Sequence, residues 1–214
     1  MAINVTNVNS VVQGITNMSD YGSKAATCFS KISEELKDFN KVWKGGIYER
    51  VANSFDSIVD DFNGLTNYIT VEVPDVINSS MEYMASVNEV TYTPPAISAA
   101  KPIEYVNAAT EDNAFMYDKA SFERKQNEIR NSIKEARQQI AYITDEVNNG
   151  SFRNGFGEND ATYEAIKSKV GSMIQTILSD VDGFETSFNS ALDEVSSAEQ
   201  KSEQSSVDNI NQIM

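Results

Sequence analysis

The sequence contains no histidine and a single cysteine, Cys28, among its 214 residues. Without histidine the chain cannot form a Ser-His-Asp triad or a Cys-His pair, and it lacks the Glu-x-x-His ligands that hold di-iron centres in helical bundles. One cysteine cannot close a disulfide within the chain. We interpret Cys28, which falls beside an apolar helical stripe, as a small buried side chain, with an intermolecular disulfide as the alternative.

Long apolar runs and basic residues are also scarce. No run of about 18 apolar residues is present, so we expect no transmembrane helix and no stable membrane insertion. The first ten residues lack the basic and apolar regions of a cleaved signal peptide. The formal net charge is −15, and residues 158–214 hold eleven acidic and three basic side chains. Such a surface repels phosphate groups, so we expect no nucleic-acid partner.

The many carboxylates do not form a catalytic pattern. The adjacent pairs at positions 60–61, 145–146 and 193–194 fall on predicted helices, where neighbouring side chains point about 100° apart. We interpret them as solvated faces, and the mixed charges of residues 123–137 as an exposed surface with salt bridges. We therefore predict that the protein is not an enzyme and has no catalytic residue, metal site or cofactor.

What the chain has in abundance is helical periodicity. Apolar or small residues recur at steps of three and four in two stretches, which predicts helices over about 7–42 and 46–89. Between them, residues 43–46 form a tight turn in which glycine permits the chain to reverse and Trp43, the only tryptophan, covers the end. The periodic positions are Val8, Val12, Ile15, Gly22, Ala25, Phe29, Ile32, Leu36, Phe39 and Trp43, then Ile47, Val51, Phe55, Ile58, Phe62, Leu65 and Ile69.

This helical hairpin resembles the WXG-motif family, the early-secreted-antigen-like substrates of bacterial type VII secretion. Residues 1–90 have the length of one such protein, with Trp43 and Gly45 in the expected place. The resemblance implies that Trp43 and Gly45 are recognition residues and that the membrane-associated secretion ATPase is a partner. The alternative is that Trp43 is only a core residue closing an ordinary helix pair.

The second half repeats this plan. The same spacing predicts helices over about 111–148 and 160–200, with a turn at 149–159 and a polar tail at 201–214 that is a frayed helix end or a disordered segment. The hairpin of residues 111–200 looks like a degenerate second copy, because its turn lacks tryptophan and is longer. Phe152 or Phe156 could take the place of the tryptophan. We expect this turn to be a solvated loop, with a partner-contact loop as the alternative.

Proline marks two further features. Pro74 interrupts the second predicted helix, which should kink or restart there. Residues 91–110 form a proline-containing linker that favours extended backbone. About twenty extended residues reach roughly 60–65 Å, close to the length of a helix of about forty residues. The linker can therefore run the full length of the molecule.

Such a linker is required if the two hairpins lie antiparallel with their turns at opposite ends. Since WXG-motif proteins pair as antiparallel hairpins, we predict an all-α protein in which two long hairpins form an elongated four-helix bundle, like a fused dimer of that family. The alternatives are a slack linker between parallel hairpins, or hairpins that do not pack together. The chain could be a monomer or a domain-swapped dimer.

The mycobacterial branch of the family carries a Tyr-x-x-x-Asp/Glu secretion signal after its second helix. Two segments here match it, one from Tyr68 to Glu72 and one from Tyr142 to Glu146, but neither lies in a tail. We interpret them as structural and retain Tyr68 and Glu72 as a candidate signal. The signal could instead be composite or lie after Ala198.

We therefore expect a non-enzymatic helical protein, a substrate or effector partner of a type VII secretion system, that acts through protein–protein surfaces. Its partners would be the secretion ATPase and a co-secreted helical protein. It would be cytoplasmic before export and then secreted or at the cell surface, without a cleaved signal peptide. The alternative is an intracellular helical chaperone or adaptor for a type VII secreted toxin.

Overall fold

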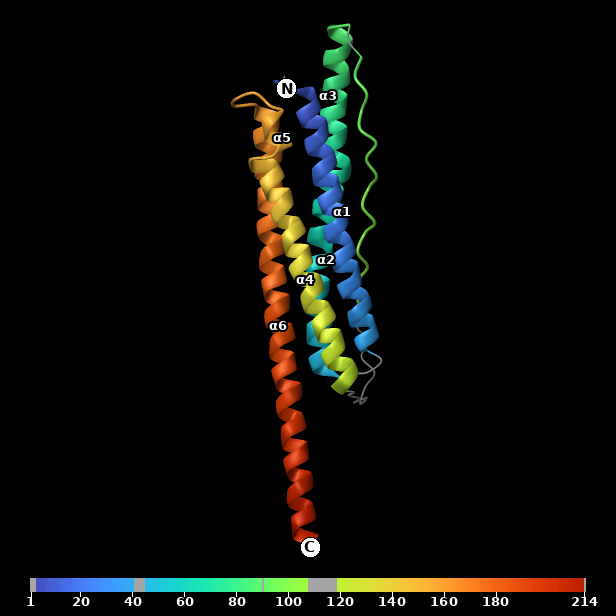
Figure 1. Cartoon of the computed structure of the whole chain (residues 1–214), viewed down its shortest axis with the longest axis vertical. Coiled ribbons are helices and arrows are strands. Elements are labelled where there is room, and N and C mark those ends of the chain that lie inside the picture. The colour runs from blue at the N-terminus through green and yellow to red at the C-terminus, as the bar shows by residue number, and fades with distance from the viewer. Residues whose placement is uncertain (1–2, 41–44, 90, 108–118, 214) are drawn as a thin grey trace.

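The computed structural model describes residues 3–40, 45–89, 91–107 and 119–213, which form an elongated bundle of helices (Figure 1). The prediction of an all-α bundle of four long helical elements is confirmed. In chain order the elements are α1 (Val8–Phe39), α2 (Gly46–Asn67), the π-helix η1 (Tyr68–Glu72), α3 (Val73–Val87), α4 (Lys119–Asn148), the short α5 (Ser151–Asn154) and α6 (Ala161–Ile213). The second long element is α2, η1 and α3 together.

Contacts between the two halves of the chain dominate the packing, because α1 packs mainly against α4 and α2 mainly against α6. Near the start of α1, the Asn17 amide donates to Glu146 (3.0 Å), and near its end Glu35 pairs with Lys125 (2.7 Å). Residues that come later in α1 therefore contact residues that come earlier in α4, so these two helices run in opposite directions.

The same order holds between the other two long elements. Arg50 pairs with Glu194 (2.7 Å) and Glu72 pairs with Lys169 (3.3 Å). The residues that flank the first turn lie at one end of the bundle, and α5 lies at the other end (Figure 1). The likeness of this arrangement to a fused dimer of WXG-motif proteins stays a prediction.

The core runs along the whole bundle and is built from apolar side chains of all the long helices. Aromatic pairs join different helices: the ring centroids of Phe55 and Phe184 are 5.4 Å apart, and those of Phe39 and Phe122 are 5.3 Å apart. Each fully buried phenylalanine contributes about 1.5–3 kcal/mol. These pairs join the two halves of the chain, so each hairpin covers part of the apolar stripe of the other.

The restart predicted at Pro74 is present and takes the form of a π-helical turn. Pro74 lies in the first turn of α3 and has no N–H to donate to a carbonyl of the preceding turn. The Ser19 hydroxyl of α1 donates to the carbonyl of Ile69 (3.3 Å), so a side chain from another helix supplies the missing donor. Ser19 is buried for this reason.

One predicted helix boundary is wrong. α6 does not end near residue 200 but continues to Ile213, and its last turns project beyond the rest of the bundle (Figure 1). No glycine or proline follows Gly183, so nothing in the sequence breaks the helix.

Residues 91–107 are extended, as their prolines predict, and run back along the bundle.

Candidate functional site

The first turn ends at Gly45, whose backbone has φ 117° and ψ 178°. This region of conformational space is essentially restricted to glycine. The Gly45 carbonyl accepts from the N–H of Glu49 (3.2 Å), which is the first hydrogen bond of α2. A side chain at Gly45 would meet no atom of the described residues within 4 Å, its chain neighbours apart. The sequence therefore requires glycine here for its backbone conformation and not for lack of space. Trp43, the other residue of the motif, lies outside the described residues.

Behind Gly45, Tyr48 joins the two helices of the first hairpin. Its hydroxyl donates to the carbonyl of Leu36 (2.9 Å), in the last turn of α1, and its ring is buried. Burial, together with the negative charge of Asp56, raises the pKa of Tyr48 to about 12. The tyrosine thus adds a second donor to a carbonyl that also accepts from the N–H of Asn40 (3.3 Å).

The start of α2 also faces α6. Ile47 is half-buried and lines a shallow groove with residues of α6. Arg50 pairs across this groove with Glu194 (2.7 Å), but both side chains are well exposed, so the pair contributes about 1 kcal/mol or less. α6 continues past this end of the bundle (Figure 1). The α6 residues of the groove are Ser190, Asp193, Glu194, Ser197, Ala198 and Lys201.

The candidate signal residues Tyr68 and Glu72 lie elsewhere, in η1. Lys169 of α6 contacts both: its ammonium is 3.8 Å from the Tyr68 ring centroid and 3.3 Å from the Glu72 carboxylate. Burial, with the negative charge of Glu72, raises the pKa of Tyr68. Along α6, Lys169 is separated from Glu194 by roughly 35–40 Å of helix. The structure therefore does not bring Tyr68 and Glu72 together with Gly45.

The prediction that the second turn is a solvated loop is wrong for its aromatic side chains, which are buried, although Asn149, Asn154, Glu158 and Asn159 are exposed. The rings of Phe152, Phe156 and Tyr163 are buried and pack on one another, with 5.0 Å between the two phenylalanine centroids and 5.5 Å between Phe156 and Tyr163. The guanidinium of Arg153 covers the Tyr163 ring at 5.0 Å. Both phenylalanines thus take interior positions; that one of them replaces the tryptophan of the motif stays a prediction.

The N-terminal segment, residues 3–7, holds this turn in place. The N–H of Thr6 donates to the Gly155 carbonyl (2.9 Å), and the N–H of Gly157 donates to the Asn4 carbonyl (2.8 Å). The carboxylate of Asp160, which caps α6, accepts from the N–H of Asn4 (2.6 Å). Periodicity could not reveal this contact, although the Asp160 cap before a helical stretch could be recognised in the sequence.

Two charged side chains predicted on exposed surfaces are buried. Lys125 lies between Glu35 (2.7 Å) and Asp38 (3.4 Å) of α1. Burial lowers the pKa of Lys125, but the hydrogen bonds and charges of the two carboxylates outweigh it, so the pKa is raised. Glu146 accepts from the N–H of Phe152 (2.8 Å). Both fix the register of α4 and are structural.

Cys28 is only half-buried, and burial raises the pKa of its thiol.

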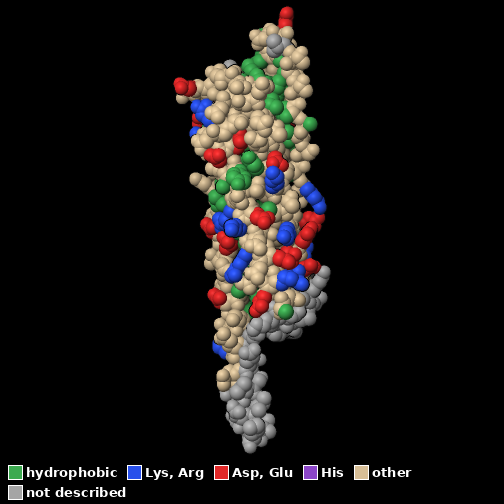
Figure 2. All heavy atoms as spheres, viewed as in Figure 1, with side chains coloured by type: hydrophobic (Ala, Val, Ile, Leu, Met, Phe, Trp, Pro, Cys, Tyr) green, Lys and Arg blue, Asp and Glu red, His purple; other side chains and the backbone are tan. Residues whose placement is uncertain are grey.

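A separate apolar surface lies on α3. Val76, Tyr83 and Val87 share one helical face and are 51%, 72% and 64% exposed. Figure 2 shows apolar side chains gathered towards this end of the molecule, while charged side chains of both signs cover the middle. The sequence positions of these residues matched the helical period, which cannot distinguish a covered face from an uncovered one.

Searches of the chain against models of protein families, against curated proteins and against solved structures found no match. Within the described residues, no three His, Cys, Asp or Glu side chains are grouped so as to hold a metal ion. Among the helices of the described part of the chain, none has a stretch long and apolar enough to cross a bilayer. The resemblance to the WXG-motif family therefore depends on the sequence of the first hairpin and the geometry at Gly45.

Proposed function

We propose that the protein is a non-enzymatic helical substrate, or effector partner, of a bacterial type VII secretion system. The observation that carries the proposal is the backbone of Gly45. The turn between two long helices uses a conformation restricted to glycine, at the position where the WXG motif places its glycine. An ordinary helix pair can be closed by many turn sequences, so the combination of Trp43, Gly45 and this geometry favours the motif.

In this proposal the protein acts through surfaces. Trp43 and Gly45 form the recognised turn, and the neighbouring groove with α6 adds polar contacts beside it. The secretion ATPase is the first partner, and a co-secreted helical protein is the second. The protein is cytoplasmic before export and functions outside the cell.

Export in the native host tests the proposal. The amount of protein in culture medium is compared between wild-type cells and cells that lack the secretion ATPase, with a cytosolic marker to exclude lysis. We expect the protein in the medium only when the ATPase is present. Retention in both strains, with stable co-purification of a second protein, would contradict the proposal and favour the intracellular adaptor.

The role of the turn needs its own variants. Trp43→Ala should keep the helix content measured by circular dichroism but reduce export several-fold. Tyr83→Ala is the matched control, because it removes an exposed aromatic ring from α3, away from the first turn. Equal export of Trp43→Ala and the unmodified protein would show that the turn is not recognised. Whether the protein is secreted at all is decided separately, by the comparison of strains with and without the ATPase.

A further inference from the structure

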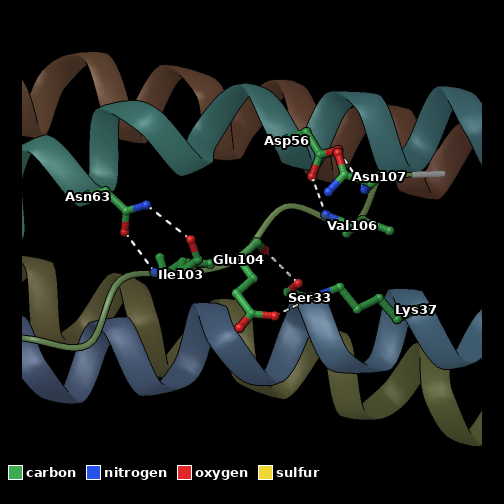
Figure 3. A network of polar contacts seen from close by, with 8 residues as sticks. All are labelled: Ser33, Lys37, Asp56, Asn63, Ile103, Glu104, Val106 and Asn107. Carbon is green, nitrogen blue, oxygen red and sulfur yellow. Dashed lines mark hydrogen bonds and ion pairs between the residues drawn. The ribbon is translucent and has the colours of Figure 1, made fainter.

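The extended linker lies in a groove between α1 and α2 for part of its length (Figure 3). We call residues 91–107 the strap. Ile103 and Val106 of the strap are 3% and 6% exposed and belong to the hydrophobic core, whereas most other strap side chains face solvent. The strap is therefore seated at two apolar positions three residues apart.

The helices contact the strap chiefly through its backbone. The Asn63 side chain accepts from the N–H of Ile103 (2.8 Å) and donates to the carbonyl of the same residue (3.0 Å). This is the pair of hydrogen bonds that a neighbouring β-strand would provide. The Asp56 carboxylate accepts from the N–H groups of Val106 (2.7 Å) and Asn107 (3.2 Å). Figure 3 shows both side chains pointing from α2 into the groove.

The opposite wall of the groove, α1, completes this pattern. The Ser33 hydroxyl donates to the carbonyl of Glu104 (2.7 Å), and the Lys37 ammonium lies 3.1 Å from the Glu104 carboxylate. Ser33 is buried. Two helices thus supply donors and acceptors for backbone groups of one extended segment. They also supply a basic side chain, Lys37, for Glu104, the acidic residue that follows Ile103.

A connection between α3 and α4 needs only sufficient length. Backbone-directed side chains on two helices, with two apolar pockets in register, are instead the features by which proteins bind extended peptides. We propose that the groove between α1 and α2 is a binding site for an extended peptide with the pattern apolar–acidic–any–apolar, and that the strap fills this site within the chain. The proposal does not depend on how the protein is exported.

The strap has a large advantage over any free peptide in binding to the groove, because it is part of the same chain. A tethered segment has an effective concentration of about millimolar, so a peptide in solution binds weakly while the strap is seated. The site becomes available when the two apolar anchors of the strap are removed. The groove side chains Asn63, Asp56 and Ser33 remain unchanged in such a variant.

The test uses the full chain with Ile103→Ser and Val106→Ser. The probe is a fluorescein-labelled synthetic peptide with the sequence of residues 97–107, and binding is followed by fluorescence anisotropy. We expect the double variant to bind the peptide at least tenfold more tightly than the unmodified protein. Adding Asn63→Ala should weaken this binding at least tenfold, whereas Asn53→Ala, an exposed asparagine on the same helix, should not. Equal binding by the double variant and the unmodified protein would overturn the proposal, as would indifference to Asn63→Ala.

Hydrogen exchange on the unmodified chain keeps the proposal testable if the double variant does not fold. The amides of Ile103 and Val106 should exchange at least tenfold more slowly than that of Ala96, an exposed residue of the strap. Asn63→Ala should accelerate the amide of Ile103 selectively, because it removes the acceptor of that N–H. Exchange of Ile103 as fast as that of Ala96 would show that the groove does not hold the segment.

Discussion

In each hairpin, a tyrosine at the third position of the second helix donates a hydrogen bond to a carbonyl near the end of the first helix. Tyr48 donates to Leu36 in the first hairpin (2.9 Å) and Tyr163 donates to Val147 in the second (2.9 Å). The two turns therefore share one local solution for joining their helices, which supports the interpretation of the second hairpin as a degenerate copy of the first.

The glycines around the two turns have opposite surroundings. At the first turn, side chains added at Gly45 and Gly46 would meet no atom within 4 Å in the part of the chain that the structure describes. At the second turn, a side chain at Gly155 would come within 2.7 Å of the Val11 backbone, and one at Gly14 would overlap the backbone of Phe152. Glycine serves backbone conformation at the first turn and close packing at the second.

The two ends of the bundle therefore differ in how closely other segments pack against the turn. The second turn packs its aromatic side chains against α1 and the N-terminal segment, while Asn149, Asn154, Glu158 and Asn159 stay exposed. At the first turn, none of the described residues comes within 4 Å of a side chain added at Gly45, its chain neighbours apart. Substitutions at the glycines test this difference between the two turns.

The largest effect is expected at the second turn. Gly14→Ala places a methyl group against the backbone of Phe152, which cannot move without displacing α5 from α1. Overpacking of a core contact costs about 3 kcal/mol when backbone must shift. For a chain of this size that lowers the Tm by about 6–12 °C, which thermal unfolding followed by circular dichroism measures.

Gly64→Ala is the matched control for Gly14→Ala. Gly64 also lies inside a long helix, but its added methyl group would meet only the end of the Met173 side chain, at 3.5 Å. The control should unfold at the same temperature as the unmodified protein or slightly higher. If both variants were equally stable, α5 would not be seated on α1 as the structure has it.

At the first turn, Gly45→Ala should destabilise by about 1–2 kcal/mol, because the methyl group disfavours a positive φ. Gly46→Ala is the neighbouring control: its backbone is not in the left-handed region, so its effect should be within about 0.5 kcal/mol. Urea unfolding distinguishes the two. Equal stability of the two alanine variants would mean that the turn can rearrange and that glycine is not required there.

The shared tyrosines predict a smaller and more symmetrical effect. Tyr48→Phe and Tyr163→Phe each remove one hydrogen bond to a buried carbonyl, at a cost of about 1 kcal/mol each. Similar losses in the two variants would support the equivalence of the two hairpins. A loss at only one site would show that the second hairpin joins its helices by other contacts.

Tyr48 also makes stability depend on pH. Its folded-state pKa is raised to about 12, above the value near 10 of an unfolded tyrosine. Its contribution is therefore fully present below pH 10 and lost as the pH rises towards 12, because the unfolded chain ionises first. Tyr48→Phe should lose less stability than the unmodified protein between pH 8 and pH 11, measured by urea unfolding. An identical loss would place the alkaline sensitivity elsewhere, for example at Tyr163, whose pKa burial also raises.

Periodicity predicted the helices because apolar residues at steps of three and four mark the face that must be covered. It could not predict what covers that face. The docking of residues 3–7 on the second turn and the seating of Ile103 and Val106 in the groove depend on contacts between segments far apart in sequence. The polar composition of residues 201–214 predicted a frayed helix end or a disordered segment, whereas α6 continues to Ile213 because no helix breaker is present.

The candidate site was predictable to a similar extent. A Trp-x-Gly turn between two periodic stretches placed Gly45 at the reversal of the chain, and its positive φ explains why glycine is there. The burial of Phe152 was not predictable, since glycine-rich turns are usually exposed. Nor was the role of Asn63, because an isolated asparagine on a helix gives no sign that it contacts a distant backbone.

The smallest effect is expected at glycines that belong to neither turn. Gly171 and Gly183 lie inside α6, their φ angles are not positive, and added side chains would meet nothing within 4 Å. Each change to alanine should therefore stabilise by about 0.5–1 kcal/mol through helix propensity and a less flexible unfolded chain. The two effects should add, because the sites are roughly 18 Å apart along the helix. Loss of stability in either variant would mean that something packs closely against this face of α6 in solution, as it does at Gly14, Gly22 and Gly155.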